Sequence, residues 1–429
     1  MLKLGLGREI ITPEIGCHMA GYGWDVFSES INDDLTATAM LFDYDGEKVL
    51  LINTTVCQQG DYTINYIKSK IKENYGLEAD HISVLSTHTH SGPVTYATVG
   101  WGETDIDYCN KILFPQVLKA VDAAFSSLTE VKVGVGTTES KVGINRREFG
   151  PDDEVILGQN PWGQYDPEMT VIAFRTMDDK PYANIIHYTC HGTAAGTNHE
   201  ISRDWSGPMI DRMEKQTGAM TVFFNGAAGD VGPRVTNGTT KGDITDVKEL
   251  GDCAAQDAFR AYKSIKAFRD EDMETVSGKI LLPYRELPTL EEARKGYEAA
   301  LLLSETNMHL HERDFYKKVI EFYENNETRE EGRLLDLNVL RIGDVVFLPF
   351  GFELFSEIGL RLRNYSKYQH TLTCCYTDIS QGYMPSKDQT ARNGYEIFMF
   401  KTAGTRSLTD DADGYLIRGA LKIMEGLKK

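Results

Sequence analysis

The sequence predicts a mixed α/β fold, with a mixed sheet at its core and helices on its flanks. Three observations favour this class. Apolar runs typical of buried strands recur along the chain, and segments with apolar residues at helical spacing lie between several of them. Hydrophobic residues make up 41% and charged residues 25% of the 429 residues, which is ordinary for a globular protein with a sizeable core.

Strand and helix patterns alternate over the first third of the chain. Residues 2–6 alternate leucine with glycine or lysine as in a strand, and residues 37–56 predict a hairpin that turns at Asp45-Gly46. After them we expect a helix over 62–77, a strand over 81–90, a helix over 107–128 and a strand over 131–139.

Later segments continue the same mixture. Apolar runs of the kind found near a sheet centre are followed by amphipathic patterns. We expect strands over 170–176, 183–192 and 220–230, a helix over 248–265, a return to the sheet and then a helix over 337–364, and a last helix over 414–427.

Residues 288–333 differ in composition, because Glu, Lys and Arg alternate there with Leu and Tyr. The segment opens with a capping box from Thr289 to Glu292. It therefore predicts a helical hairpin inserted on the outside of the sheet. No linker, repeat or low-complexity tract divides the sequence, so we expect a single catalytic domain over residues 1–429.

Charge and cysteine usage exclude some classes of partner and compartment. The 64 acidic and 45 basic residues give a net charge of −19, which repels nucleic acid, so no nucleic-acid partner is expected. Seven scattered cysteines predict free thiols. Arg8 and Glu9 interrupt any secretory signal, and no apolar run reaches the ~20 residues of a transmembrane segment, so we expect a cytoplasmic protein.

Two histidines stand out at the end of the strand expected over 81–90. On a strand, His88 and His90 face the same way and can reach one pocket. They could supply two metal ligands, one ligand and one proton carrier, or two hydrogen-bonded structural histidines.

A second histidine pair and a carboxylate extend this pattern. His187 and His191 share a face if residues 183–192 are extended, with His191 at the expected strand end and His187 better suited to the core. Glu353 follows an apolar run, where it needs a cation or a strong donor, or else caps the following helix.

Three further segments carry candidate polar groups. The glycine-rich turn over 225–234 lacks the pattern of a phosphate-binding loop and predicts a tight loop that brings Asp230 to a substrate. Of Arg146 and Arg147, one could be a surface salt-bridge partner and the other could orient a carbonyl. Tyr383 and Tyr395 lie in a late loop, where packing is the plain alternative.

Taken together, these segments resemble the catalytic domain of the neutral/alkaline non-lysosomal ceramidase family. The motifs follow the family's order along nearly the whole chain. They are ITPEIGCHMAGYG, STHTHSGP, INRR, HYTCHGTAAG followed by ISRDWSGPM, GAAGDVGPR, LPFGFELF and GYMPSKDQTARNGYE.

The resemblance implies one Zn²⁺ per chain and assigns roles to particular residues. The implied metal ligands are His88, His191, Glu353 and Tyr383. The other implied site residues are His90 near the metal water, Arg146 and Tyr395 as further catalytic residues, and Asp230 and Gly232 at the substrate. The activity implied is hydrolysis of a linear amide bond in a small-molecule N-acyl compound.

The departures from the family pattern surround the substrate rather than the metal. Gly232 replaces the serine of the GDVSPN motif, and Val94 and Thr95 replace paired glycines after HTHSGP. The C-terminal immunoglobulin-like domain of the family is also expected to be missing. The same metal centre could therefore act on a non-ceramide amide, ester, lactone or other polar substrate, or the protein could be a non-catalytic, metal-stabilised binding protein.

Overall fold

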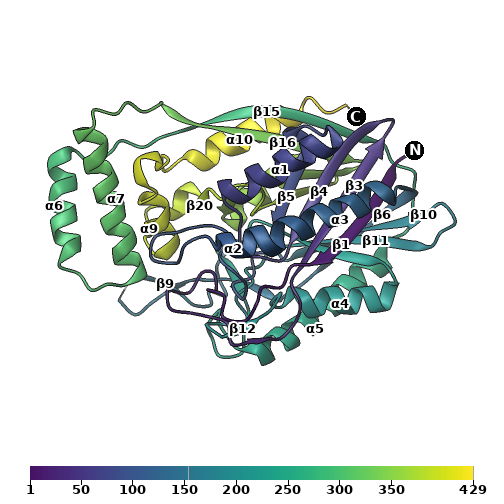
Figure 1. Ribbon diagram of the computed structural model, residues 1–429, viewed down its shortest axis with the longest axis horizontal. Helices are drawn as coiled ribbons and strands as arrows, with labels where there is room; N and C mark the ends of the chain where they lie inside the picture. The colour runs from purple at the N-terminus through teal and green to yellow at the C-terminus, as the bar shows by residue number, and fades with distance from the viewer. Residues whose placement is uncertain (153, 429) are drawn as a thin grey trace.

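The structure is a computed structural model that describes residues 1–152 and 154–428. Its largest sheet has eight strands in the order β13-β11-β10-β6-β1-β3-β4-β5 (Figure 1). Only β4–β5 and β11–β13 are parallel among its described pairs, so the predicted mixed sheet with flanking helices is confirmed. The strands are β1 (Lys3–Ile10), β3 (Thr36–Tyr44), β4 (Glu47–Thr54), β5 (Ile82–Ser86), β6 (Thr129–Glu139), β10 (Glu168–Thr176), β11 (Pro181–Tyr188) and β13 (Met220–Asn225).

A second sheet faces the first. Its four strands have the order β15-β16-β17-β19. Side chains of both sheets form one buried cluster, in which Phe42, Phe174 and Phe224 of the first sheet join Leu340 and Phe347 of the second. The strands are β15 (Met273–Pro283), β16 (Gly332–Ile342), β17 (Val345–Pro349) and β19 (His370–Cys374).

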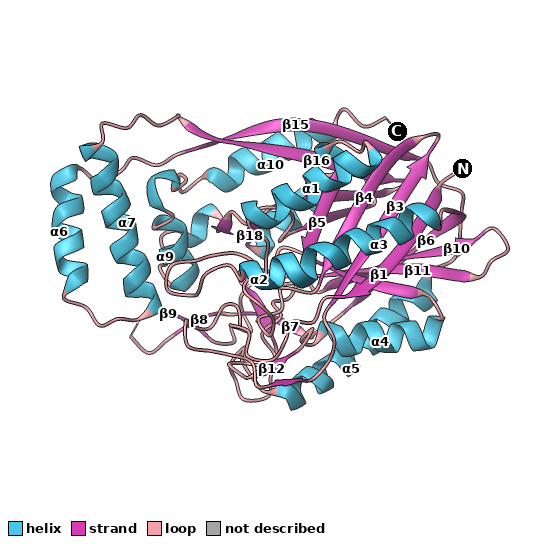
Figure 2. Ribbon diagram, in the orientation of Figure 1, coloured by secondary structure: helices cyan, strands magenta, loops and turns pink. Residues whose placement is uncertain are grey.

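Helices cover the outer face of each sheet, which gives four layers (Figure 2). Buried clusters join α1, α3, α4 and α5 to the first sheet and α8 and α10 to the second. Each helix buries one apolar stripe, as Ile64, Ile67 and Ile71 of α1 do. The helices are α1 (Asp61–Tyr75), α3 (Phe114–Ser126), α4 (Ser206–Thr217), α5 (Ile244–Ser264), α8 (Ser356–Tyr365) and α10 (Ala412–Met424).

Local sequence signals explain several boundaries. Asp45 and Gly46 have φ of 52° and 91°, the left-handed values that a tight hairpin turn between β3 and β4 requires. Helix α1 ends at Gly76, with φ of 68°. These two boundaries confirm the sequence predictions.

Two helices, α6 (Leu290–Leu301) and α7 (Asn307–Glu324), pack against each other between β15 and β16. They form a hairpin at one end of the molecule, away from the sheet layers (Figure 1). The side chain of Thr289 accepts from the Glu292 N–H, and the Glu292 carboxylate accepts from the Thr289 N–H, so the predicted capping box is present.

Four sequence predictions were wrong in their boundaries. The strand expected over 220–230 ends at Asn225. The strand expected to reach His90 ends at Ser86, because His88 has a φ of 68° that no strand accommodates. The strand expected to reach residue 192 ends at Tyr188. The helix expected over 107–128 is divided into α2 (Ile106–Tyr108), a π-helical turn and α3.

Short strand pairs and helices complete the described structure. These strands are β2 (Ser30–Ile31) with β12 (Glu200–Ile201), β7 (Gly143–Asn145) with β14 (Val231–Pro233), β8 (Arg147–Phe149) with β9 (Val155–Leu157), and β18 (Phe352–Leu354) with β20 (Gly382–Met384). Helix α9 spans Tyr395–Lys401. None of the helices in the described part of the chain has the length and apolar character needed to cross a membrane.

Candidate metal centre

Three buried side chains from distant parts of the sequence meet at the ends of the sheets. The Nε2 atoms of His88 and His191 each lie 3.3 Å from Oε2 of Glu353. One ligand atom from each residue lies within 4.8 Å of the others. The structure thus brings together two nitrogens and one carboxylate oxygen, the donor set that zinc prefers.

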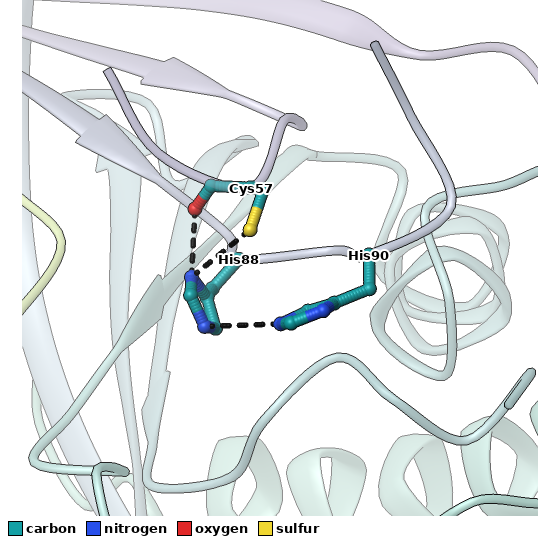
Figure 3. Close-up of side chains that lie close together, drawn as sticks. All are labelled: Cys57, His88 and His90. Carbon is teal, nitrogen blue, oxygen red and sulfur yellow. Dashed lines mark hydrogen bonds between the residues drawn. The ribbon is translucent and has the colours of Figure 1, made fainter. Parts of the chain in front are cut away.

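The backbone after β5 orients His88. Its Nδ1 lies 2.8 Å from the carbonyl oxygen of Cys57 and 3.6 Å from the Cys57 Sγ (Figure 3). The ring therefore donates its Nδ1–H to the carbonyl, which leaves the Nε2 lone pair free. Tyr376 stacks on the other side of this ring, with centroids 3.9 Å apart.

His191, which follows strand β11, is oriented in the same way. Its Nδ1 lies 2.6 Å from the carbonyl oxygen of Ala228, so the tautomer again leaves Nε2 free. Ala228 belongs to the glycine-rich turn, which approaches Glu353 closely because Gly229 has no Cβ to collide with the Glu353 carbonyl. This turn thus contributes a backbone acceptor that fixes a histidine, a role the sequence analysis missed.

Glu353 lies on strand β18 and faces the two histidines. It is paired directly with Tyr383 on the parallel strand β20, so both side chains project from the same face. The alternative that Glu353 caps the following helix is wrong, because that helix begins after Phe355. The N–H of Ser356 in its first turn donates instead to Asp230, at 2.7 Å.

The electrostatics of the cluster favour a positive charge beside Glu353. Burial acts against the charged form of His88, but Cys57 and Glu353 outweigh it and raise its pKa to about 10. Burial, Arg146 and His88 lower the pKa of His191 to about 3. Burial would raise the pKa of Glu353, but the two histidines hold it well below its usual value. Glu353 thus favours a positive charge at His88 Nε2, a position that a bound cation would take.

Unsatisfied atoms in the cluster show that a metal fits. His191 Nε2, Glu353 Oε2 and the Tyr376 hydroxyl are buried and have no hydrogen-bond partner among the described residues. Leaving such groups unpaired is costly, and both imidazoles are already held in the tautomer a metal needs. His88, His191 and Glu353 form one group that could hold the ion, and Cys57, His88 and His90 form a second, overlapping group.

His90 lies beside this cluster rather than in it. Its Nε2 is 3.2 Å from His88 Nε2, and its Nδ1 has no partner (Figure 3). The ring packs against Gly21, where any Cβ would overlap it, and lies 5.3 Å from the Tyr22 ring. Burial and the neighbouring His88 lower the pKa of His90 well below its usual value, so the ring is neutral.

Both arginines of the INRR motif are buried, so the prediction that one is a surface salt-bridge partner was wrong. Arg146 and Arg147 share the buried carboxylate of Glu396, with N···O distances of 2.8 and 2.7 Å. Arg146 also donates from Nη2 to the Tyr383 hydroxyl at 2.9 Å. The shared glutamate fixes both guanidinium groups, and Arg146 in turn positions Tyr383.

A cavity of about 770 Å³ opens over the cluster. His88, His90, Glu353, Tyr383 and Tyr395 line its metal-side end. The ring centroids of the two tyrosines are 5.8 Å apart. The packing alternative for this pair does not account for their place on the cavity surface, beside a candidate metal centre.

The two residues expected at the substrate lie under the cluster instead of on the cavity lining. Asp230 accepts from Asn145 Nδ2 at 3.1 Å and from Ser356, and burial raises its pKa to about 7. Gly232 lies on β14, and a Cβ there would come within 2.6 Å of the Thr240 Cβ. The side chain of Thr240 thus fills the space that a serine at position 232 would need. The substrate-binding role of both residues stays a prediction.

Sequence reasoning missed three residues of the site. Tyr376, Cys57 and Glu396 contact the candidate ligands or the arginines described above. The left-handed φ of 56° at Tyr376, unusual for a bulky residue, is not readable from the sequence. For Glu396, its place next to Tyr395 in the late motif was the available signal.

Comparisons with known proteins agree with the fold described above. Residues 2–277 match the family model described as neutral/alkaline non-lysosomal ceramidase, N-terminal. Two solved structures resemble the chain, each with a TM-score of 0.73 and 17% sequence identity: the neutral ceramidase from Pseudomonas aeruginosa and a ceramidase complexed with C2. The match covers 100% and 99% of this chain and 75% and 76% of theirs, and it shows a shared fold. No curated protein sequence matches the chain.

Proposed function

The chain belongs to the neutral/alkaline non-lysosomal ceramidase family, and on that premise we propose that this ceramidase-like hydrolase is a zinc-dependent amidase. The observation that carries the proposal is the convergence of His88, His191 and Glu353, with both histidine Nδ1 atoms committed to backbone carbonyls. Tyr383 is proposed as the fourth ligand, because it shares the face of Glu353.

These residues would hold a zinc ion, which would supply Lewis acidity for a water molecule and an amide carbonyl. The reaction consumes one water and cleaves one C–N bond, giving a carboxylic acid and an amine. A proton must therefore move from the attacking water to the leaving nitrogen.

His90 is placed to carry that proton. Its neutral ring presents Nε2 beside His88, on the cavity surface, so Nε2 can take a proton from water and return it to the amine nitrogen. The Nδ1 atom makes no competing hydrogen bond. Burial and His88 lower the pKa of His90, so the ring is neutral before it takes up a proton.

Arg146 and Tyr395 are proposed to position the substrate. Arg146 donates to the Tyr383 oxygen, which holds that phenol at the end of the cavity beside Glu353. Tyr395 stands at the first turn of α9 and forms the adjoining wall. Arg146 is a positioning residue, because it acts on the site through Tyr383.

Two alternatives are separated by one experiment. The purified, zinc-loaded protein is assayed against acyl-sphingoid amides and short N-acyl amines, with an ester and a lactone of matched acyl length. Amide hydrolysis that disappears on chelation and returns with zinc supports the proposal. Hydrolysis of only the ester or lactone assigns the same centre a different bond, and absence of turnover with full zinc occupancy favours a non-catalytic binding protein.

A further inference from the structure

The cavity extends beyond the metal cluster to a part that carries charged side chains. Helix α7 contributes Asp314 and Lys318 to it, and these two form an ion pair at 2.5 Å. Arg333 at the start of β16 and Arg406 also line the cavity. Asp314 neutralises Lys318. The two arginines are therefore the positive charges of this wall whose partners must be identified.

Arg333 is held in place without being neutralised. Its Nη1 donates to the side-chain oxygen of Gln381, and its Nη2 donates to the carbonyl oxygen of Arg406 at 3.4 Å. The guanidinium lies over the Phe352 ring, with 5.9 Å to the centroid. These partners are uncharged, and they leave several of the five N–H donors of the arginine free.

Among the described residues, neither arginine forms an ion pair with a carboxylate. The titratable groups that influence Arg333 are Tyr284, Arg406 and Tyr96, and burial lowers its pKa. This is unexpected in a chain with 64 acidic and 45 basic residues, where a carboxylate is readily available as a partner. Asp61 and Asp314 line the same cavity, but neither lies within ion-pair distance of these two guanidinium groups. Paired guanidinium groups without a carboxylate partner are suited to binding an anion.

The arginines lie close enough to the metal cluster for one small substrate to reach both. Gln381, which holds Arg333, is two residues from Tyr383, so their Cα atoms lie within about 7 Å of each other. The phenol of Tyr96 on the same cavity is influenced by both Arg333 and Glu353. An anionic group bound by Arg333 would thus lie a few bonds from an amide at the metal.

We propose that Arg333 and Arg406 form an anion subsite, and that the substrate is a small N-acyl compound whose amine portion carries a carboxylate or a similar anionic group. This assignment rests on the proposed amidase function for its choice of bond. The arginines bind the anion, and the cluster of His88, His191 and Glu353 lies at the amide. A neutral sphingoid amide would leave both guanidinium groups without a partner.

The test compares amides that differ only in the amine portion. N-hexanoylglycine supplies a carboxylate, N-hexanoyltaurine a sulfonate and N-hexanoylethanolamine a neutral hydroxyl. Binding is measured by calorimetry in the His88→Ala background, where the ligand is not consumed. We expect the anionic amides to bind about tenfold to a hundredfold more tightly than the neutral one, with the tighter of the two identifying the preferred anion.

Substitutions then assign that preference to the arginines. Arg333→Gln should abolish it, and Arg406→Gln, at an exposed position, should weaken it without a risk to folding. Arg418→Gln is the control. It removes the same charge, but Arg418 is exposed on α10, outside the cavity. Equal binding of charged and neutral amides, or an unchanged preference in both cavity variants, would overturn the subsite.

The binding measurement also keeps this inference separate from the proposed function. A zinc-loaded native protein that hydrolyses no amide refutes the amidase, while the His88→Ala background still reports on the anion. In the active protein, the ratio of kcat/KM for N-hexanoylglycine to that for N-hexanoylethanolamine should fall at least tenfold in Arg333→Gln and stay constant in Arg418→Gln.

Discussion

The metal cluster and the far wall of the cavity differ in how their polar side chains are held. In the cluster, His88 and His191 each spend one ring nitrogen on a backbone carbonyl, and all three candidate ligands are buried. In the far wall, Arg333 is held by neutral acceptors and keeps its charge for a partner in the cavity. Histidine rings that are held by the backbone favour a single geometry of the metal centre. A guanidinium group without a carboxylate partner favours one kind of substrate over another.

The two regions also differ in their relation to the family. The match to the family model covers residues 2–277, which include both candidate histidine ligands and His90. The far wall comes from α7, Arg333 and residues 399–406, all beyond that range. Glu353, the third candidate ligand, also lies beyond residue 277, so the candidate metal centre spans both parts of the chain, whereas the two arginines lie only in the second.

The largest expected effect comes from breaking the cluster. His88→Ala or His191→Ala should lose bound zinc and reduce hydrolysis by more than about 10³-fold, since the Lewis acid is worth several kcal/mol. Metal content is measured by mass spectrometry. His187→Ala is the matched control, because His187 is also buried but its Nε2 bonds to the Thr373 carbonyl at 2.9 Å. Full zinc occupancy in both ligand variants would contradict the site.

His90→Ala should separate metal binding from proton transfer. The variant should retain zinc and lose about 10²- to 10⁴-fold in kcat, which is the usual contribution of a general acid–base. Zinc content and kcat are measured on the same preparation. If zinc is lost as in His88→Ala, then His90 is a ligand and the division between the two histidines is wrong.

Asp230, which is buried beside the cluster, should make the free energy of unfolding depend on pH. Asp230 has a folded-state pKa of about 7 against an ordinary value of 3.8, so the folded state binds its proton more tightly than the unfolded state. The resulting stabilisation is present below about pH 4 and is lost as pH rises to about 7, by up to about 4 kcal/mol. The measurement is the difference in free energy of unfolding between the native chain and Asp230→Asn. Parallel pH curves for the two proteins would refute the assignment.

The smallest expected effect tests the departure at Gly232. Gly232→Ser should destabilise the fold by about 1–3 kcal/mol, because the new side chain would overlap Thr240. Adding Thr240→Gly should recover part of this loss, a coupling that a double-mutant cycle measures by denaturant unfolding. Additive effects of the two substitutions would show that Thr240 does not occupy the space of the family serine.

Local structure followed from short stretches of sequence. The turn at Asp45-Gly46, the apolar face of α1 and the capping box at Thr289 each depend on residues a few positions apart, so their physics is contained in the sequence itself. The set of candidate ligands also followed from the sequence, through its resemblance to a family and not through the spacing of the residues.

Only the tertiary structure decided how those ligands meet. His88 points at Glu353 because of a left-handed turn after Ser86, and His191 does so because a carbonyl from residue 228 fixes its ring. The strand expected through His90 was therefore wrong in its geometry. The sequence determined which groups could bind a metal. Their tautomers, their charge and the position of the two cavity arginines depend on contacts between segments far apart in the chain. Such contacts arise only on folding.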